Sequence, residues 1–240
     1  MKTIEVCLLP ALFRFKSTSK DYIVVVIDVL RATTAFCAAF DSGVKSIIPV
    51  SGLDELLEYK NKGFITAAER DGKKVDFVDF GNSPSIFLQS DLQGEKLAYS
   101  TTNGTQAIEL AKGCGNIAIA SFANLKVISD WLVTQDLNIV ILCSGWKNTF
   151  SLEDTLCAGA LTELLELSGH FNKICDSSTA SLSLWQLSKN NLIETAQLAS
   201  HYKRLATLGL HADLKFCFQI NSSQAVPIWD GSAFEDVSKF

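Results

Sequence analysis

The chain has 240 residues, 48% of them hydrophobic, and a formal net charge of −5 at pH 7. This length allows one large α/β domain or two small ones, and the composition allows a large buried core. The negative charge argues against general nucleic-acid binding, which needs a basic surface. No apolar run in the sequence reaches the length of a membrane-spanning helix. We therefore expect neither nucleic acid nor a membrane as a partner.

The compartment is indicated by the N-terminus and the cysteines. The opening segment MKTIEVCLLPALFRF has a short apolar stretch and no small-residue cleavage site, so it does not predict a secretory signal. The seven cysteines form no C-x-x-C pair, and most lie in apolar runs. This pattern predicts reduced thiols rather than disulfides or a zinc site. We expect a cytoplasmic protein; its oligomeric state is left open, and a homo-oligomer is allowed.

The first two thirds of the chain alternate β-branched runs with helical patterns. Strands are expected at Tyr22–Asp28, Lys45–Val50, Phe64–Ala68, Lys96–Ser100, Asn116–Ser121 and Asn138–Cys143. Helices are expected at Thr33–Asp41, Leu53–Lys62, Thr105–Lys112, Leu125–Gln135 and Glu153–Ser168. Apolar strands that alternate with helices predict a three-layer α/β/α sandwich with a mostly parallel or mixed central sheet.

The last third has a different pattern. Ser178–Gly209 is expected to form one or two helices, Ala212–Ile220 alternates like a half-buried strand, and the segment AVPIW closes the fold. No linker separates it from the rest. We therefore expect a single domain over 1–240, with an α/β core at 1–170 and C-terminal helices and closing strands at 171–240.

Three strand ends share a pattern of small and hydroxyl residues that lead into a helix. They are Val26–Phe36, Ala98–Ile108 and Ile141–Thr155. In an open α/β sheet, ligands bind outside the carboxyl ends of the strands, and helix N-termini suit a phosphate. Three such ends could therefore converge on one anion site.

Several known phosphate and hydrolase signatures are absent from the sequence. It has no P-loop, no G-x-G-x-x-G, no G-x-S-x-G and no H-E-x-x-H. Leu30 stands two positions after Asp28, where a haloacid dehalogenase has a second aspartate. Thr149 stands six positions after Cys143, where a cysteine phosphatase needs arginine.

Acids near strand ends are the remaining candidates for chemistry: Asp28, Glu69, Asp79, Glu153 and Asp154. Mg²⁺ prefers oxygen ligands and is usually held by one or two carboxylates, waters and substrate oxygens. Carboxylates beside loops rich in N–H groups therefore suit metal-assisted phosphoryl transfer. Arg31 and Arg70 could clamp the phosphate or a second acidic group of the substrate.

Each candidate also has a purely structural alternative. Asp28 and Arg31 could pair with each other, with Thr33 or Thr34 as a helix cap. The segment SLED, from Ser151, matches a capping box. Structural ion pairs resemble functional sites. The case for a site rests on several segments that share one edge of the sheet.

These segments resemble the magnesium-dependent 2-phosphosulfolactate phosphatases over nearly the whole chain. The matching stretches are DVLRATT (Asp28–Thr34), ERDG (Glu69–Gly72), GNSP (Gly81–Pro84), TTNGT (Thr101–Thr105), CSGW (Cys143–Trp146), LEDTLCAG (Leu152–Gly159), HYKRL (His201–Leu205), DLKFCF (Asp213–Phe218) and VP (Val226–Pro227). The resemblance implies a Mg²⁺-dependent hydrolase of a small phosphorylated acid. One departure is the stretch QINSSQAVP, where an acid is expected near Asn221.

The resemblance also implies roles for single residues. Catalytic residues would be Asp28, Arg31, Glu69, Arg70 and Asp154. The metal and its waters would be held by Asp28, Glu69, and one or both of Glu153 and Asp154. The phosphate or sulfonate would be cradled by Thr33, Thr34, Asn103, Gly104, Thr105, Ser144 and Gly145.

Three questions stay open at this point. Asp28 could be a nucleophile that forms an acyl phosphate, or metal-bound water could attack in line. His201 or Arg204 could assist the leaving alcohol. The substrate could be another phosphorylated carboxylic acid. The chain could also be a non-catalytic phosphoanion-binding protein, but Asp28, Glu69, Glu153 and Asp154 together argue against this.

Overall fold

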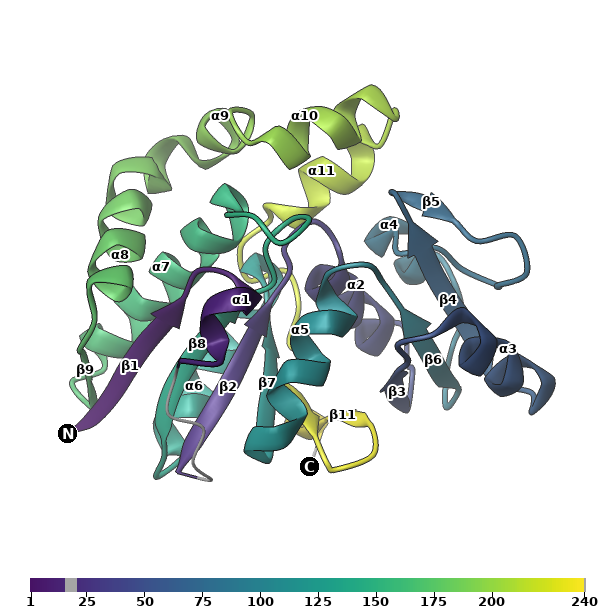
Figure 1. Cartoon of the computed structure of the whole chain (residues 1–240), viewed down its shortest axis with the longest axis horizontal. Coiled ribbons are helices and arrows are strands. Elements are labelled where there is room, and N and C mark those ends of the chain that lie inside the picture. The colour runs from purple at the N-terminus through teal and green to yellow at the C-terminus, as the bar shows by residue number, and fades with distance from the viewer. Residues whose placement is uncertain (16–20, 240) are drawn as a thin grey trace.

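The computed structural model describes residues 1–15 and 21–239. Its eleven strands form one sheet in the order β5-β4-β6-β3-β11-β10-β7-β2-β8-β1-β9 (Figure 1). The strands are β1 Lys2–Cys7, β2 Tyr22–Ile27, β3 Ser46–Pro49, β4 Ile65–Arg70, β5 Lys73–Lys74, β6 Lys96–Ser100, β7 Asn116–Ala120, β8 Asn138–Cys143, β9 Phe171–Lys173, β10 Pro227–Trp229 and β11 Phe234–Asp236.

Strand β2 explains why the sheet is covered on both faces. Ile23, Val25 and Ile27 are buried in one apolar cluster, whereas Val24 and Val26 are buried in another on the opposite face. A strand that is apolar at every position is typical of a parallel strand between two helical layers. It pairs in parallel with both β7 and β8.

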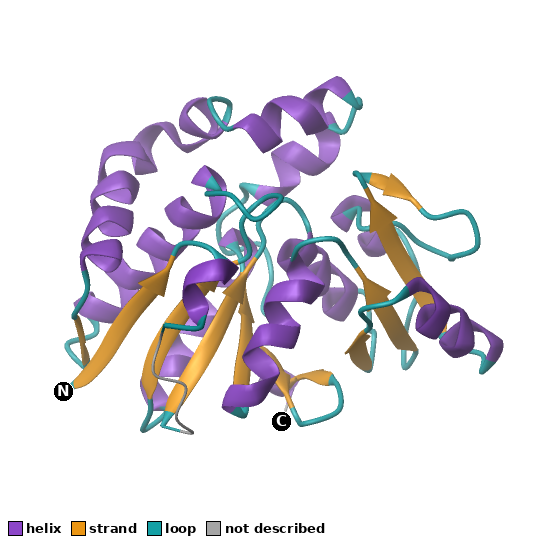
Figure 2. Ribbon diagram, in the orientation of Figure 1, coloured by secondary structure: helices purple, strands orange, loops and turns teal. Residues whose placement is uncertain are grey.

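Helices lie on both sides of the sheet (Figure 2). They are α1 Pro10–Phe13, α2 Ala32–Asp41, α3 Leu53–Asn61, α4 Pro84–Leu88, α5 Gly104–Ala111, α6 Leu125–Thr134, α7 Leu152–Leu167, α8 Asp176–Ser188, α9 Leu192–Ala196, α10 Ser200–Thr207 and α11 His211–Cys217. Short 3-10 turns are η1 Lys112–Cys114, η2 Phe122–Asn124, η3 Lys189–Asn191 and η4 Val237–Lys239. Buried side chains of α6 and α7 belong to the apolar cluster on one face of the sheet. Buried side chains of α1, α2 and α5 belong to the cluster on the other face. The predicted three-layer α/β/α fold is confirmed.

The C-terminal third differs from expectation in two ways. The segment Ser178–Gly209 was expected to hold one or two helices, but α8, α9 and α10 cover it. The strand expected at Ala212–Ile220 is wrong, because its first part is helix α11. The alternation of Leu214, Phe216 and Phe218 fits a strand. In the helix, however, the buried residues include Leu214 and Cys217, which are three positions apart and therefore share one helical face.

The chain end completes the sheet. Strands β10 and β11 form an antiparallel pair inserted between β7 and β3, and they make the otherwise largely parallel sheet mixed. Before them, α9, α10 and α11 pass over the carboxyl ends of the strands (Figure 1). Within the described residues, no helix is long and apolar enough to cross a membrane.

Candidate active site

A pocket lies at the carboxyl edge of the sheet, next to α10. Its walls come from the ends of β2, β4, β6 and β8 and from α10. Asp28, Thr101 and Trp146 belong to the three similar strand ends, and all three line the pocket. The expectation that these segments meet is therefore confirmed, as the topology of a parallel sheet requires.

Asp28 follows the last residue of β2 and is 6% exposed. Its Oδ1 accepts one long hydrogen bond, 3.4 Å from Ala32 N. Burial raises the pKa of Asp28 to about 6; nearby His201 opposes this rise, and Glu69 and Glu153 add to it. An ionised carboxylate that is poorly solvated in this way is stabilised by a cation that approaches it.

Arg31 precedes α2 and lines the same pocket. Its Nη1 donates to Asp213 Oδ2 at 2.5 Å, and its Nη2 donates to Gly72 O at 3.2 Å. The Leu30–Arg31 peptide bond is cis. The counter-ion of Arg31 is thus Asp213 of α11, not Asp28 as the structural alternative supposed.

Glu69, near the end of β4, joins two loops of the pocket. Its Oε2 accepts from Gly72 N at 2.7 Å. Its Oε1 accepts from both the backbone N and the Oγ1 of Thr102, at 3.1 and 3.0 Å. Because three donors hold this carboxylate, it fixes the β4–β5 turn against the TTNGT loop.

Two hydrogen bonds between its threonines close the TTNGT loop at the start of α5. Thr101 N donates to Thr105 Oγ1 at 2.9 Å, and Thr105 N donates to Thr101 Oγ1 at 3.3 Å. Asn103 lines the pocket, whereas Gly104 and Thr105 are not among its lining residues. A Cβ at Gly104 would lie 3.0 Å from Asp28 Oδ2, so this glycine permits the close approach of the loop to the acid.

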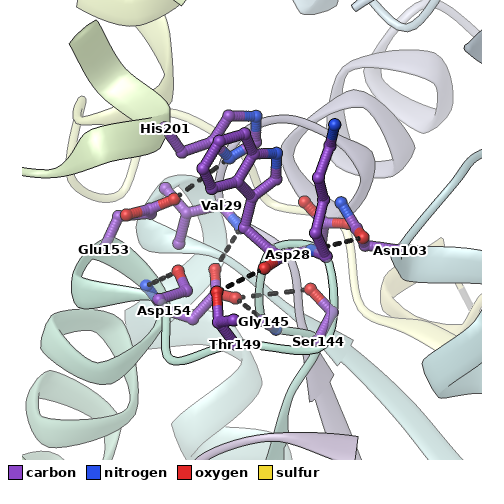
Figure 3. A network of polar contacts seen from close by, with 12 residues as sticks. Asp28, Val29, Asn103, Ser144, Gly145, Thr149, Glu153, Asp154 and His201 are labelled. Carbon is purple, nitrogen blue, oxygen red and sulfur yellow. Dashed lines mark hydrogen bonds and ion pairs between the residues drawn. The ribbon is translucent and has the colours of Figure 1, made fainter. Parts of the chain in front are cut away.

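Asp154 organises the loops rather than lining the pocket (Figure 3). Its Oδ1 accepts from Val29 N at 2.9 Å, and its Oδ2 accepts from Gly145 N at 3.1 Å and Ser144 Oγ at 3.3 Å. Burial raises the pKa of Asp154 well above its ordinary value. Ser151 caps α7, as the SLED pattern predicted, by accepting from Asp154 N at 3.2 Å.

Glu153 contacts a histidine of the C-terminal helices (Figure 3). Its Oε1 lies 3.2 Å from His201 Nδ1, and the Glu153 side chain is 2% exposed. The imidazole of His201 also stacks on the indole of Trp146, with ring centroids 5.3 Å apart and an angle of 11° between the planes. His201 and Trp146 line the pocket. Two contacts thus fix the orientation of the imidazole.

Four other candidate residues point elsewhere. Arg70 donates to Ser100 Oγ at 2.9 Å and to Ser100 O at 3.3 Å. The hydroxyls of Thr33 and Thr34 donate to backbone oxygens at the end of β2, at 2.9 and 3.0 Å. Asp79, in the loop between β5 and α4, accepts hydrogen bonds from Lys60 and from Thr66 of β4. None of these four is a lining residue of the pocket, and their predicted roles stay predictions.

The pocket also contains residues that the sequence analysis did not select. They include Asp71, Asn82, Trp146 and Lys147, and Asp213 stands directly behind Arg31. All except Lys147 lie inside the segments ERDG, GNSP, CSGW and DLKFCF, which carry the family resemblance. The resemblance therefore indicated these segments, but not these individual residues.

The departure near Asn221 lies away from the pocket. Asn221 Oδ1 accepts from Lys126 N at 2.8 Å, and Asn221 N donates to Phe122 O at 3.0 Å. The side chain therefore binds the start of α6. The C-terminal acid that reaches the site is Asp213.

Two oxygen donors of the pocket are of the kind that Mg²⁺ binds. Among the described residues, no group of three or more His, Cys, Asp or Glu side chains is placed to hold a metal. Asp28 is nevertheless a buried, weakly bonded carboxylate, and the buried Asn82 Oδ1 has no hydrogen-bond partner among the described residues. Oxygen donors of this kind fit Mg²⁺, which usually keeps several waters.

The fold and the pocket together define a class. The chain is an α/β enzyme with a pocket at the carboxyl edge of its sheet, in which buried carboxylates face cationic side chains. Such an arrangement can bind an anionic substrate and stabilise the charge that develops on it during a reaction.

Comparisons with known proteins define the family. A family model described as 2-phosphosulpholactate phosphatase matches residues 7–232. A protein of Caldanaerobacter subterraneus subsp. tengcongensis, named probable 2-phosphosulfolactate phosphatase, is 32% identical over 212 residues, which cover 87% of this chain and 88% of that protein. Proteins with the same name from Thermotoga maritima and Prochlorococcus marinus are 36% and 37% identical, and each match covers 85% of this chain and 87% of the relative. The chain belongs to the 2-phosphosulpholactate phosphatase family and is therefore a phosphoric monoester hydrolase.

Proposed function

We propose that this chain hydrolyses 2-phosphosulfolactate to sulfolactate and phosphate in the cytoplasm, with Mg²⁺ as its cofactor. Family membership supports the reaction class. The observation that carries the proposal is the placement of Asp28 and Arg31, a buried carboxylate and a buried guanidinium, in one pocket at the carboxyl edge of the sheet. A phosphate group there meets both a group that can attack or activate a nucleophile and a positive charge.

Each residue has a defined task in this reaction. Arg31 offsets the negative charge of the phosphate, and Asp213 keeps the guanidinium in place. The ionised carboxylate of Asp28 either attacks phosphorus, which forms an acyl phosphate that water then hydrolyses to release phosphate, or accepts the proton of an attacking water. As the phosphorus–oxygen bond breaks, the leaving alcohol needs a proton. His201 supplies it from Nε2, because Nδ1 faces Glu153.

A bound Mg²⁺ would be held by Asp28 and Glu69, with Asn82 as a further oxygen donor, and would neutralise charge on the phosphate. Glu153 and Asp154 were also predicted near the metal. In this proposal Glu153 orients His201, which it contacts, and Asp154 holds the loop at Gly145. Glu69 is held by three donors, so its position is fixed before any cation binds.

The test is phosphate release from 2-phosphosulfolactate and from 2-phospholactate, each with and without Mg²⁺. We expect Mg²⁺-dependent release with a clear preference for the sulfonated ester. Equal release from both esters would retain the phosphatase but remove the named substrate. Binding without release from either would instead indicate a phosphoanion-binding protein.

A matched pair of variants tests the proton donor. His201→Gln removes the transferable proton and should lower kcat by about 10²-fold or more. The control His211→Gln changes an exposed histidine at the start of α11 and should leave kcat unchanged. Normal kcat in His201→Gln would remove this residue from the mechanism.

A further inference from the structure

Two long cationic side chains gather around Trp146 in the wall of the pocket. Lys147 Nζ lies 5.7 Å from the centroid of the indole, and the Arg204 guanidinium lies 5.8 Å from it. Lys147 follows β8, whereas Arg204 belongs to α10, one turn after His201. Both line the pocket that contains Asp28 and Arg31.

These two cations share one acidic partner, Asp71. Asp71 Oδ1 lies 3.5 Å from Lys147 Nζ and 3.5 Å from Arg204 Nη2. The Asp71 side chain is 73% exposed. An ion pair with such an exposed partner contributes little to stability, so an anion from solution can replace the carboxylate at small cost.

Arg204 has a second anchor that does not depend on the Asp71 carboxylate. Its Nη2 donates to the backbone O of Asp71 at 2.6 Å. If the Asp71 carboxylate moves away, this bond still holds the guanidinium beside the pocket. Arg31 differs from Arg204 in this respect. Its Nη1 binds the buried carboxylate of Asp213, which an ion from solution cannot replace.

We propose that Lys147 and Arg204 bind an acidic group of the substrate other than its phosphate, and that Asp71 occupies this subsite in the free enzyme. The substrate class is then a phosphate monoester with at least one further anion, a sulfonate or a carboxylate. The inference rests on the proposed function and adds the residues that select the substrate. It also gives the pocket two cationic regions, with Arg31 for the phosphate and Lys147 and Arg204 for the second anion.

The first experiment compares two esters that differ in their second anion. One is 2-phosphosulfolactate, and the other is 2-propyl phosphate, which has the same secondary ester and no other acid. Arg204→Gln and Lys147→Gln should each raise KM for 2-phosphosulfolactate about tenfold, with kcat nearly unchanged, because a charge-assisted hydrogen bond to the substrate is lost. Neither variant should change KM for 2-propyl phosphate. The control Lys203→Gln removes an exposed positive charge from the same helix and should change neither value.

Asp71→Asn provides a test in the opposite direction. It removes the competing carboxylate and should lower KM for 2-phosphosulfolactate about threefold, while KM for 2-propyl phosphate stays the same. A general loss of folding cannot produce this improvement. Equal changes for both esters, or no change in any variant, would overturn the proposal.

Two further measurements separate the remaining possibilities. The first is the KM of Arg204→Gln for 2-phospholactate, which has a carboxylate but no sulfonate. The same increase in KM as for 2-phosphosulfolactate would show that the subsite binds the carboxylate, and no increase would show that it binds the sulfonate. Both outcomes support the subsite. If the wild-type enzyme releases phosphate from no ester, the proposed function fails. Calorimetric titration with 2-phosphosulfolactate and 2-propyl phosphate then decides the subsite, because weaker binding of only the former in Arg204→Gln supports it and equal binding overturns it.

Discussion

Asp213 binds Arg31 across 182 residues of sequence, with 2.5 Å between Oδ2 and Nη1. Both side chains are buried, at 3% and 4% exposure. The other oxygen of Asp213 accepts from Ser83 Oγ at 2.6 Å and from Ser85 Oγ at 2.8 Å. One carboxylate therefore ties α11, the start of α4 and the pocket arginine together, and the C-terminal third of the chain supports the site.

Asp213→Asn should therefore reduce both stability and activity. The variant leaves the Arg31 guanidinium buried without a counter-ion, which typically costs about 3–5 kcal/mol of unfolding free energy. Arg31 also loses its fixed position, so kcat/KM should fall at least about tenfold. Urea unfolding and steady-state kinetics measure these effects. Asp130→Asn, which breaks an exposed pair with Lys126, is the control; if the two variants behave alike, Asp213 does not position Arg31.

The sequence was informative about where the site would form. Asp28, Thr101 and Trp146 each follow an apolar strand, and parallel strands bring such ends to one edge. Local periodicity determines this outcome, so no knowledge of the tertiary contacts was needed. The cap of α7 by Ser151 was equally local and was equally visible in the SLED pattern.

The partners of the site residues could not be obtained in this way. The alternation of Leu214, Phe216 and Phe218 indicates a strand, although the chain forms helix α11 there and buries Leu214 and Cys217 on one face. Asp213 belongs to this helix, so its contact with Arg31 could not be predicted either. Thr33 and Thr34 were predicted to bind the phosphate because hydroxyl residues after a strand often do so. In the fold, their hydroxyls donate instead to the backbone oxygens of Asp28 and Val29. Side-chain hydroxyls choose between these partners only in the folded chain.

Ser151→Ala should destabilise the protein by about 1 kcal/mol, because Asp154 N at the start of α7 loses its acceptor. The measurement is the midpoint of chemical unfolding. Ser183→Ala is a matched control within α8: its hydroxyl is exposed and donates to Thr179 O in the same helix. Alanine favours a helix interior, so the control should be neutral or slightly stabilising. An unchanged midpoint in Ser151→Ala would show that this cap contributes nothing measurable.

Removal of divalent cations should stop phosphate release without unfolding the enzyme. The core on both faces of the sheet is made of packed hydrophobic side chains, so circular dichroism should stay unchanged in EDTA. Added Mg²⁺ should restore activity. Calcium, a larger ion that tolerates irregular coordination, should restore less. Full activity after dialysis against chelator would contradict the magnesium proposal.

Asp28→Asn should abolish turnover and, unusually for a buried polar residue, increase stability at neutral pH. The folded pKa of Asp28 is about 6, against an ordinary value of 3.8, so the folded state binds a proton more tightly than the unfolded state. Stability therefore falls as pH rises from about 4 to about 6. Above this range the ionised side chain costs up to about 3 kcal/mol, which asparagine avoids.

The measurement is the unfolding free energy of wild type and variant between pH 4 and pH 8, in buffer with EDTA so that no bound cation offsets the charge. The difference should be small at pH 4 and grow to a plateau above pH 6. Asp79→Asn is the control of opposite sign. Although partial burial opposes the effect, hydrogen bonds from Lys60 and Thr66 lower the pKa of Asp79, so its ionised form stabilises the fold and the substitution should destabilise it at neutral pH. A pH-independent difference in Asp28→Asn would show that the buried charge of Asp28 does not oppose folding.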